Sequence, residues 1–243
     1  MGDSYSEFLK QLEDRSRVKQ ERFMNHIATR LKRPRVLEKP EHPFRGAPDF
    51  WHAFTWSEEE RIEHFTANFQ NAGGHVIRAA DMQEASILIA EQAHELEAKH
   101  IIRQDESALA ELGLEKALPD ASIYAWNSNA QEQWKARAAE ADMGVVMADY
   151  AAAYTGSVTV LSAPNKGRSV SLLPTMLVVL IPLYRLKTRL GEILGQFDQT
   201  QTPREQLPSG IHFISGPSRS ADIENDLTIG VHGPGQVLAI LVG

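Results

Sequence analysis

The sequence predicts an α/β protein: a mostly parallel open sheet flanked by helices, with an N-terminal helical arm. Residues 4–33 contain no glycine or proline and carry apolar residues at helical spacing. Prolines and glycines then cluster up to Pro48, as in a linker. Beyond it, short apolar runs alternate with amphipathic segments, the pattern of βαβ units. We therefore predict an arm and linker over 1–48 and one α/β domain over 49–243.

The domain elements follow from local signals. Ser57 and Glu60 form a capping box before a helix that ends at Gly73–Gly74, and Asp81 opens a second helix. Asn129 with Glu132 is expected to cap a third. Further segments are predicted as strands: 75–79, 100–103, 122–126, 143–148, 157–162 and 175–182.

The last two of these strands are joined by a segment too short for a crossover helix, so they either pair antiparallel or are linked by an irregular turn. A helix is expected over 183–197, followed by a proline-bearing loop.

Composition excludes several kinds of chemistry. The chain has no cysteine, which rules out disulfides, thiol nucleophiles and cysteine-ligated iron–sulfur clusters within it. Residues 1–40 hold 10 Lys and Arg against 6 Asp and Glu, whereas the rest holds 15 against 26. An acidic body argues against nucleic-acid binding. The basic arm either docks on an acidic partner or a second copy, as in a homo-oligomer, or is a solvated helix.

No targeting signal stands out. The longest apolar stretch, 172–183, is short and contains Pro174 and Pro182, so no membrane span is expected. The start lacks the basic and apolar regions of a secretory signal. Gly2 with Ser6 matches only the permissive myristoylation pattern. A cytoplasmic location is the plain expectation.

Polar segments at strand ends are the candidate binding site, because helix N-termini and strand ends collect ligands in open α/β sheets. We expect the segment 214–235 to form one wall of a cleft at the carboxyl edge of the sheet. The glycines of these segments let the backbone approach a ligand, and Arg219 at an expected helix start could hold a carboxylate or phosphate. The candidate ligand-binding residues are Thr155, Gly156, Ser157, Ser215, Gly216, Ser218, Arg219, Ser220, Gly233 and Gly235. The candidate proton-transfer residues are Asp222, Glu224 and His232.

Each of these pieces has an ordinary alternative. Ser-Gly-Pro is a common turn, and a serine cap followed by an acid is normal helix chemistry. Lys166 and Arg168 are either exposed hairpin charges or the rim of a pocket. The sequence has no Walker motif, GxGxxG, HExxH or GxSxG, so those nucleotide, metal and serine-hydrolase sites are not predicted.

Four segments together resemble the lactate-utilisation protein C family, the group with the LUD domain: "FMNHIATRL", "ADYAAAYTGSVTVL", "SLLPTMLVVLI" and "SGPSRSADIENDLTIGVHGPG". Ser220 stands where the family pattern suggests threonine. The resemblance runs from about residue 20 to the C-terminus. It implies a fold similar to the CoA-transferase, ribose-5-phosphate isomerase and 5-formyltetrahydrofolate cyclo-ligase group.

The resemblance also implies a role in oxidising L-lactate to pyruvate, beside iron–sulfur partner subunits that carry the clusters this chain lacks. No cofactor is expected within the chain. Two alternatives remain open: a stand-alone enzyme acting on a sugar phosphate, an acyl-CoA or a folate, and a scaffold subunit without catalysis.

Overall fold

The computed structural model describes residues 2–35, 37–38, 54–197, 207–221 and 227–243. The chain divides into two compact units, Met1–Phe54 and Thr55–Gly243. Within the described ranges, no helix is long and apolar enough to cross a lipid bilayer.

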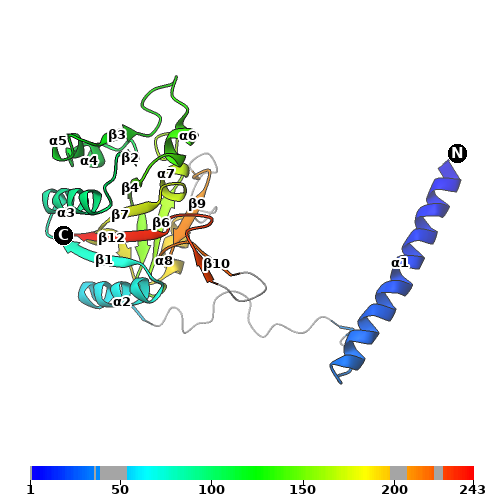
Figure 1. Ribbon diagram of the computed structural model, residues 1–243. Coiled ribbons are helices and arrows are strands. Elements are labelled where there is room, and N and C mark those ends of the chain that lie inside the picture. The colour runs from blue at the N-terminus through cyan, green and yellow to red at the C-terminus, as the bar shows by residue number, and fades with distance from the viewer. Residues whose placement is uncertain (1, 36, 39–53, 198–206, 222–226) are drawn as a thin grey trace. The chain divides into compact units, whose positions relative to one another are not determined.

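A single long helix, α1 (Gly2–Arg30), makes up most of the first unit and confirms the predicted N-terminal helix (Figure 1). Its large apolar side chains are exposed, as at Phe8 (56%) and Phe23 (63%). After the helix the chain turns back, and Arg35 binds Glu21 at 2.5 Å. Association of copies through this arm stays a prediction.

A six-stranded parallel sheet forms the centre of the second unit, in the order β1-β12-β7-β4-β2-β3. The predicted mostly parallel sheet is therefore confirmed. The inner strands β12, β7 and β4 are almost entirely apolar, because both of their faces are covered. The strands are β1 (His75–Ala79), β2 (His100–Arg103), β3 (Ser122–Ala125), β4 (Met143–Met147), β7 (Met176–Pro182) and β12 (Gln236–Val242).

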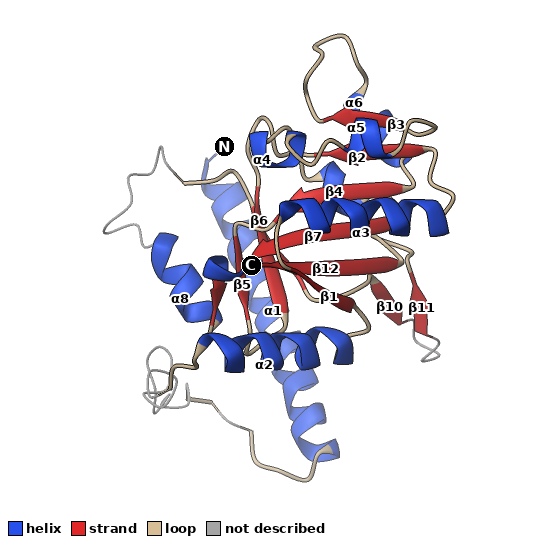
Figure 2. Ribbon diagram, turned by 90° about the vertical axis from the view of Figure 1, so that its left-hand side faces the viewer, coloured by secondary structure: helices blue, strands red, loops and turns tan. Residues whose placement is uncertain are grey.

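Each face of this sheet packs on its own apolar core. One core joins the sheet to α3, α4 and α5, and Figure 2 shows α3 lying across the central strands. The other joins it to α2, α6, α7 and a second sheet. The helices of the body are α2 (Glu58–Asn71), α3 (Met82–Glu95), α4 (Ser107–Ala110), α5 (Leu114–Ala117), α6 (Trp134–Ala139), α7 (Ser169–Leu172) and α8 (Leu190–Leu194).

The second sheet has the order β8-β5-β6-β9. Its strands β5 and β6 are antiparallel and bury Ala151, Val158 and Val160 against the parallel sheet. A separate two-stranded hairpin pairs β10 with β11. The bounds are β5 (Tyr150–Ala152), β6 (Ser157–Leu161), β8 (Leu186–Lys187), β9 (Ile211–Ile214), β10 (Arg219–Ala221) and β11 (Leu227–Ile229).

Two of the predicted helix starts are confirmed by their caps. Ser57 and Glu60 form the reciprocal capping box of α2. Asp81 accepts hydrogen bonds from the backbone N–H groups of Gln83 and Glu84 at the start of α3. These local bonds satisfy helix-end donors whatever the tertiary context, which is why the sequence alone reveals them.

The strands β6 and β7 do not pair but lie in different sheets, so the second of the two alternatives for their connection, an irregular one, holds. Two other local predictions were wrong. The expected helix over 183–197 is broken into η2 (Leu183–Arg185), β8, α8 and η3 (Gly195–Phe197). There, β8 pairs with β5, and Gly191 and Gly195 lower helix propensity. Asn129 caps no helix, because α6 begins only at Trp134.

The helix expected to start at Ser218–Ser220 was also wrong. Residues 219–221 form β10, and their backbone pairs with β11 instead of continuing as a helix. The expected helix positions Asp222 and Glu224 lie outside the described residues.

Candidate functional site

Polar residues gather where the inner parallel strands end. Glu106 follows β2, Asp149 follows β4 and Arg185 lies in η2 directly after β7. Because parallel strands end at one edge of their sheet, the topology brings these residues together although they are far apart in sequence. This is the edge where open α/β sheets bind ligands.

A turn from the second sheet adds a lysine to this edge. After β6, Ala163 and Lys166 form a β-bridge. The turn is tied to the end of β2, since Asp105 N–H donates to Asn165 O at 3.0 Å and Asn165 Nδ2 donates to Asp105 O at 2.9 Å. Lys166 is thereby held at 8% exposure. It is not an exposed hairpin charge.

The lysine joins two carboxylates. Its Nζ donates to Asp149 Oδ1 at 2.6 Å and Oδ2 at 2.8 Å, and lies 3.6 Å from Glu106 Oε1. Asp149 Oδ2 also accepts a hydrogen bond from Leu161 N–H at 2.8 Å, which fixes it against β6. We call Glu106, Asp149, Lys166 and Arg185 the carboxyl-edge cluster.

Within this cluster Glu106 is the unusual carboxyl. Burial is the main cause that raises its pKa, and the charge of Asp149 adds to it, while Lys166 and Arg185 oppose. Its Oε1 is buried and accepts no hydrogen bond from the described residues, because 3.6 Å to Lys166 is an ion-pair distance only. A carboxyl with a raised pKa and a vacant acceptor is suited to take up a proton.

A second buried side chain near the end of β2, that of Gln104, has one polar atom without a partner among the described residues. Gln104 is 0% exposed, and its Oε1 accepts a hydrogen bond from Met147 N–H at 3.0 Å. Its Nε2 has no acceptor among the described residues. Buried polar atoms are normally paired, so this donor is an exception among the buried groups of the described residues.

A cavity of about 300 Å³ opens beside the cluster. Two cations line it. Arg185 Nη1 donates to Ala148 O at 2.6 Å, and Lys187 Nζ donates to Tyr184 O at 3.3 Å. Since Lys166 neutralises Asp149, these two cations favour a small anion there. The lining residues are Asp149, Tyr150, Leu161, Tyr184, Arg185 and Lys187.

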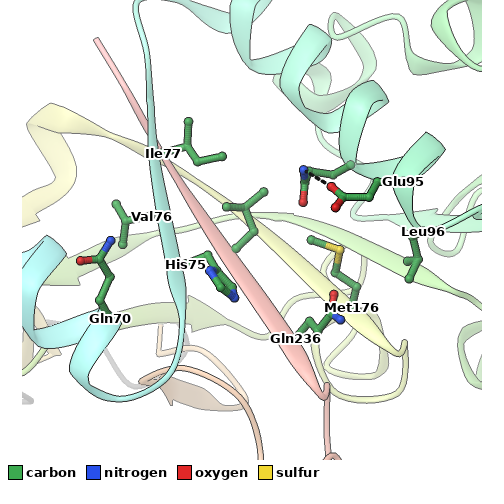
Figure 3. A pocket seen from close by; sticks show the side chains of 10 residues that line it. Gln70, His75, Val76, Ile77, Glu95, Leu96, Met176 and Gln236 are labelled. Atoms are coloured by element: carbon green, nitrogen blue, oxygen red, sulfur yellow. Dashed lines mark hydrogen bonds between the residues drawn. The ribbon is translucent and has the colours of Figure 1, made fainter.

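A larger cavity, of about 600 Å³, lies at the opposite, amino edge of the sheet. In Figure 3, His75, Met176 and Gln236 mark the starts of β1, β7 and β12, and Glu95 projects from α3. Its polar lining consists of amides, one histidine and one acid. Without a lysine or arginine in that lining, it is a poorer anion site than the carboxyl-edge cavity.

The predicted site residues lie elsewhere. Gly156, with φ of +55°, sits in the β5–β6 turn against the backbone of α2, and no side chain would fit there. The turn is tied to that helix because Asn68 Nδ2 donates to Ala153 O at 3.0 Å. Thr155 and Ser157 flank the glycine, with their hydroxyls 2.5 Å apart.

The predicted residues of the C-terminal segment gather near the start of β12. Ser218 N–H donates to Pro234 O at 2.9 Å, and Gly235 N–H donates to Thr175 O at 2.9 Å. Gly233 lies against Ser218, Gly216 against Ala72, and the guanidinium of Arg219 against Gly73. His232 is exposed, Ser215 is exposed and Ser220 is half-buried.

These contacts correct one expectation. The described parts of this segment, 215–221 and 227–235, do not form a wall at the carboxyl edge of the parallel sheet, because 227–235 leads into β12 and so meets the sheet at the amino edge. The Thr155–Ser157 turn lies beside the start of this segment, because Val158 pairs with Ile214 across β6 and β9, and Gly156 and Gly216 both pack against the C-terminal end of α2. Sequence reasoning missed Glu106 and Arg185. The sequence held a signal for both residues, since Glu106 follows the predicted strand 100–103 and Arg185 follows the predicted strand 175–182.

The fold and cluster define a class: an open α/β domain with an ionic cluster and a small cavity at the carboxyl edge of its parallel sheet. The model of the family described as "LUD domain" matches residues 62–242. The chain therefore belongs to the LUD-domain family, as the sequence resemblance suggested.

Relatives cover nearly the whole chain. A protein named Lactate utilization protein C from Halalkalibacterium halodurans is 33% identical, over 92% of this chain and 97% of its own length. One of the same name from Shouchella clausii is 34% identical, over 90% and 96%. The crystal structure of a DUF162 family protein from Deinococcus radiodurans has a TM-score of 0.55 at 18% identity, covering 77% of this chain and 99% of that one. This last match shows the fold alone.

Proposed function

We propose that this protein is a subunit of an L-lactate utilisation system and contributes to the oxidation of L-lactate to pyruvate. The observation that carries the proposal is the similarity over nearly full length to relatives named Lactate utilization protein C. Oxidation of lactate to pyruvate releases two electrons and two protons, one proton from the hydroxyl and one from C2. The chain has no cysteine to hold an iron–sulfur cluster, so iron–sulfur partner subunits accept the electrons in this proposal.

The carboxyl-edge cavity is the proposed binding site for the substrate or product. Arg185 and Lys187 offer positive charge to a carboxylate. Glu106 is not among the residues that line the cavity, but it shares Lys166 with Asp149, which is; in this proposal Glu106 takes up the proton of the lactate hydroxyl through Lys166 and Asp149. Its raised pKa brings it closer to the working range of a general base near neutral pH.

Binding to the purified full chain tests this assignment. Titration calorimetry with L-lactate, D-lactate, pyruvate and acetate should show heat for lactate or pyruvate and a loss of at least tenfold in affinity with Arg185→Gln. Arg78→Gln is the matched control, because Arg78 is exposed on β1, outside the cavity lining. Arg219→Ala examines the amino-edge segment in the same way. If Arg185→Gln binds with full affinity and Arg219→Ala does not bind, the binding site lies in the amino-edge segment instead.

Growth tests the biological role separately. A bacterium lacking its own Lactate utilization protein C gene should regain growth on L-lactate with this gene, and lose it again with Glu106→Gln. If the gene does not restore growth and the purified chain alone turns over a sugar phosphate, an acyl-CoA or a folate, the protein is a stand-alone enzyme instead. Complementation by Arg185→Gln and Glu106→Gln together would favour a scaffold.

A further inference from the structure

The amino-edge cavity, of about 600 Å³, has no part in the function proposed above. Its volume lies within the ~300–1,000 Å³ of small-molecule sites in proteins. Figure 3 shows walls from separate elements: the end of α2, the last turn of α3, and the strands β1, β7 and β12. A ligand there would meet side chains from each of these elements, so the chemistry of the lining decides what it can be.

The floor of the cavity is apolar. Met176 and Leu238 are 4% and 1% exposed, and both belong to the core that joins the sheet to α3. Ile77 packs against the same core and is half-buried. Such side chains offer no strong hydrogen-bond partner, and burying a polar group against them would cost free energy. The floor therefore accepts the hydrocarbon part of a ligand.

The rim of the cavity is polar. Its described polar residues are three amides, one imidazole and one carboxylate, with no lysine or arginine: Gln70, His75, Gln92, Glu95 and Gln236. All are exposed except Gln92, which is half-buried, so a ligand can reach them from solvent. Gln92 Nε2 donates to Glu95 Oε2 at 3.1 Å, the dashed line in Figure 3, which restrains the carboxylate beside the cavity.

Two further features make the potential at this rim negative. Glu95 is the last residue of α3, a helix of 14 residues, and the C-terminus of a helix carries about half a negative charge. The chain beyond residue 40 holds 26 Asp and Glu against 15 Lys and Arg, so the field of the body has the same sign. The carboxylate, the helix end and the body together favour a cation and oppose an anion.

The hydrogen-bonding groups of the rim indicate the kind of cation. A primary ammonium group carries three N–H donors and no acceptor. The rim supplies acceptors for them: the carboxylate of Glu95 and the amide oxygens of Gln92, whose nitrogen already donates to Glu95, and Gln236. A quaternary ammonium would leave these acceptors unused, and an alcohol, with one donor, would use only one of them. A primary amine therefore fits better than either.

We propose that the amino-edge cavity binds a small amphipathic primary amine. The ammonium group lies at Glu95, Gln92 and Gln236, and the hydrocarbon body lies on Met176 and Leu238 of the floor. This site shares no lining residue with the carboxyl-edge cavity. Either assignment can therefore fail without the other.

Three probes of similar shape test the charge preference by titration calorimetry on the full chain. Phenethylamine, phenethyl alcohol and hydrocinnamate join the same phenylethyl body to an ammonium, a hydroxyl and a carboxylate. The amine should bind with a Kd below about 1 mM. The alcohol should bind at least tenfold more weakly, and hydrocinnamate should not displace the amine.

Glu95→Gln locates the ammonium group. The change removes the charge but keeps an oxygen that can accept from Gln92, and affinity for phenethylamine should fall at least tenfold, to that of the alcohol. Glu91→Gln is the matched control, because Glu91 is exposed on the same helix and does not line the cavity. It should leave the affinity within twofold. Both variants alter exposed side chains and should keep the Tm of the parent.

Methionine methyl signals locate the hydrocarbon body. In a chain isotope-labelled at its methionine methyl groups, the NMR signal of Met176, assigned with Met176→Leu, should shift when phenethylamine is added. The signal of Met147, at the carboxyl end of β4, should stay. The proposal is overturned if phenethylamine does not bind, if the alcohol binds as tightly, if the Met176 signal does not move, or if Glu95→Gln loses no more affinity than Glu91→Gln.

Discussion

Replacing Lys166 with methionine should strongly destabilise the body of the protein. The change removes the cation between Asp149, at 2.6 and 2.8 Å, and Glu106, at 3.6 Å. Removing one member of a buried ion pair costs about 3–5 kcal/mol. The carboxylate side chains keep 19% and 23% exposure, so solvent screening lowers our expectation to about 2–4 kcal/mol. That corresponds to a fall in Tm of roughly 5–15 °C.

Urea unfolding at pH 7.5, followed by tryptophan fluorescence, measures this loss. The exposed Lys99→Met is the matched control and should change stability by less than about 0.5 kcal/mol. Adding Asp149→Asn to Lys166→Met should restore part of the stability, because it removes the stranded charge. The loss should also shrink at lower pH. Without the cation the pKa of Glu106 rises further in the folded state, because Lys166 is one of the charges that lower it, so protonation favours the fold. A loss below about 0.5 kcal/mol in Lys166→Met would refute a buried, charge-compensated cluster.

Three further predictions concern single residues. The pKa of Glu106 is raised above its ordinary 4.5. Its contribution to the free energy of unfolding is therefore full below pH 4.5 and is lost as pH rises through the folded-state pKa. Glu106→Gln should remove that decline from the pH–stability curve. Gly167→Ala should cost about 1–3 kcal/mol in thermal unfolding, because a Cβ there would overlap the Trp126 ring, and an unchanged Tm would contradict this packing. Ser57→Ala should cost about 1 kcal/mol by removing the capping box of α2, with Ser122→Ala, on the exposed start of β3, as the neutral comparison.

Local signals carried most of the fold prediction. The capping residues Ser57 and Asp81 act within one turn of helix, and the apolar runs of β4 and β7 can be recognised without knowing their neighbours. The parallel sheet followed from their alternation with helices. These features depend on few residues close in sequence.

The site depended on tertiary pairing and was harder to predict. Lys166 contacts Asp149 because the turn that carries it is hydrogen-bonded to Asp105, which follows a different strand, β2. Arg219 could start a helix by local chemistry, but pairing with β11 made it a strand residue. Which edge of the sheet a segment meets depends on strand order, and neither composition nor spacing reveals that order.

The position of β12 has a consequence for synthesis. This strand lies between β1 and β7 in the sheet, yet 156 residues separate the end of β1 at Ala79 from Gln236. At ~5–20 residues per second, β1 leaves the ribosome roughly 8–30 s before its neighbour. During that interval β1 has no strand to pair with and β7 lacks a neighbour on one side. The nascent body therefore exposes apolar strand surface until β12 has left the ribosome, and chaperone binding would be concentrated in that period.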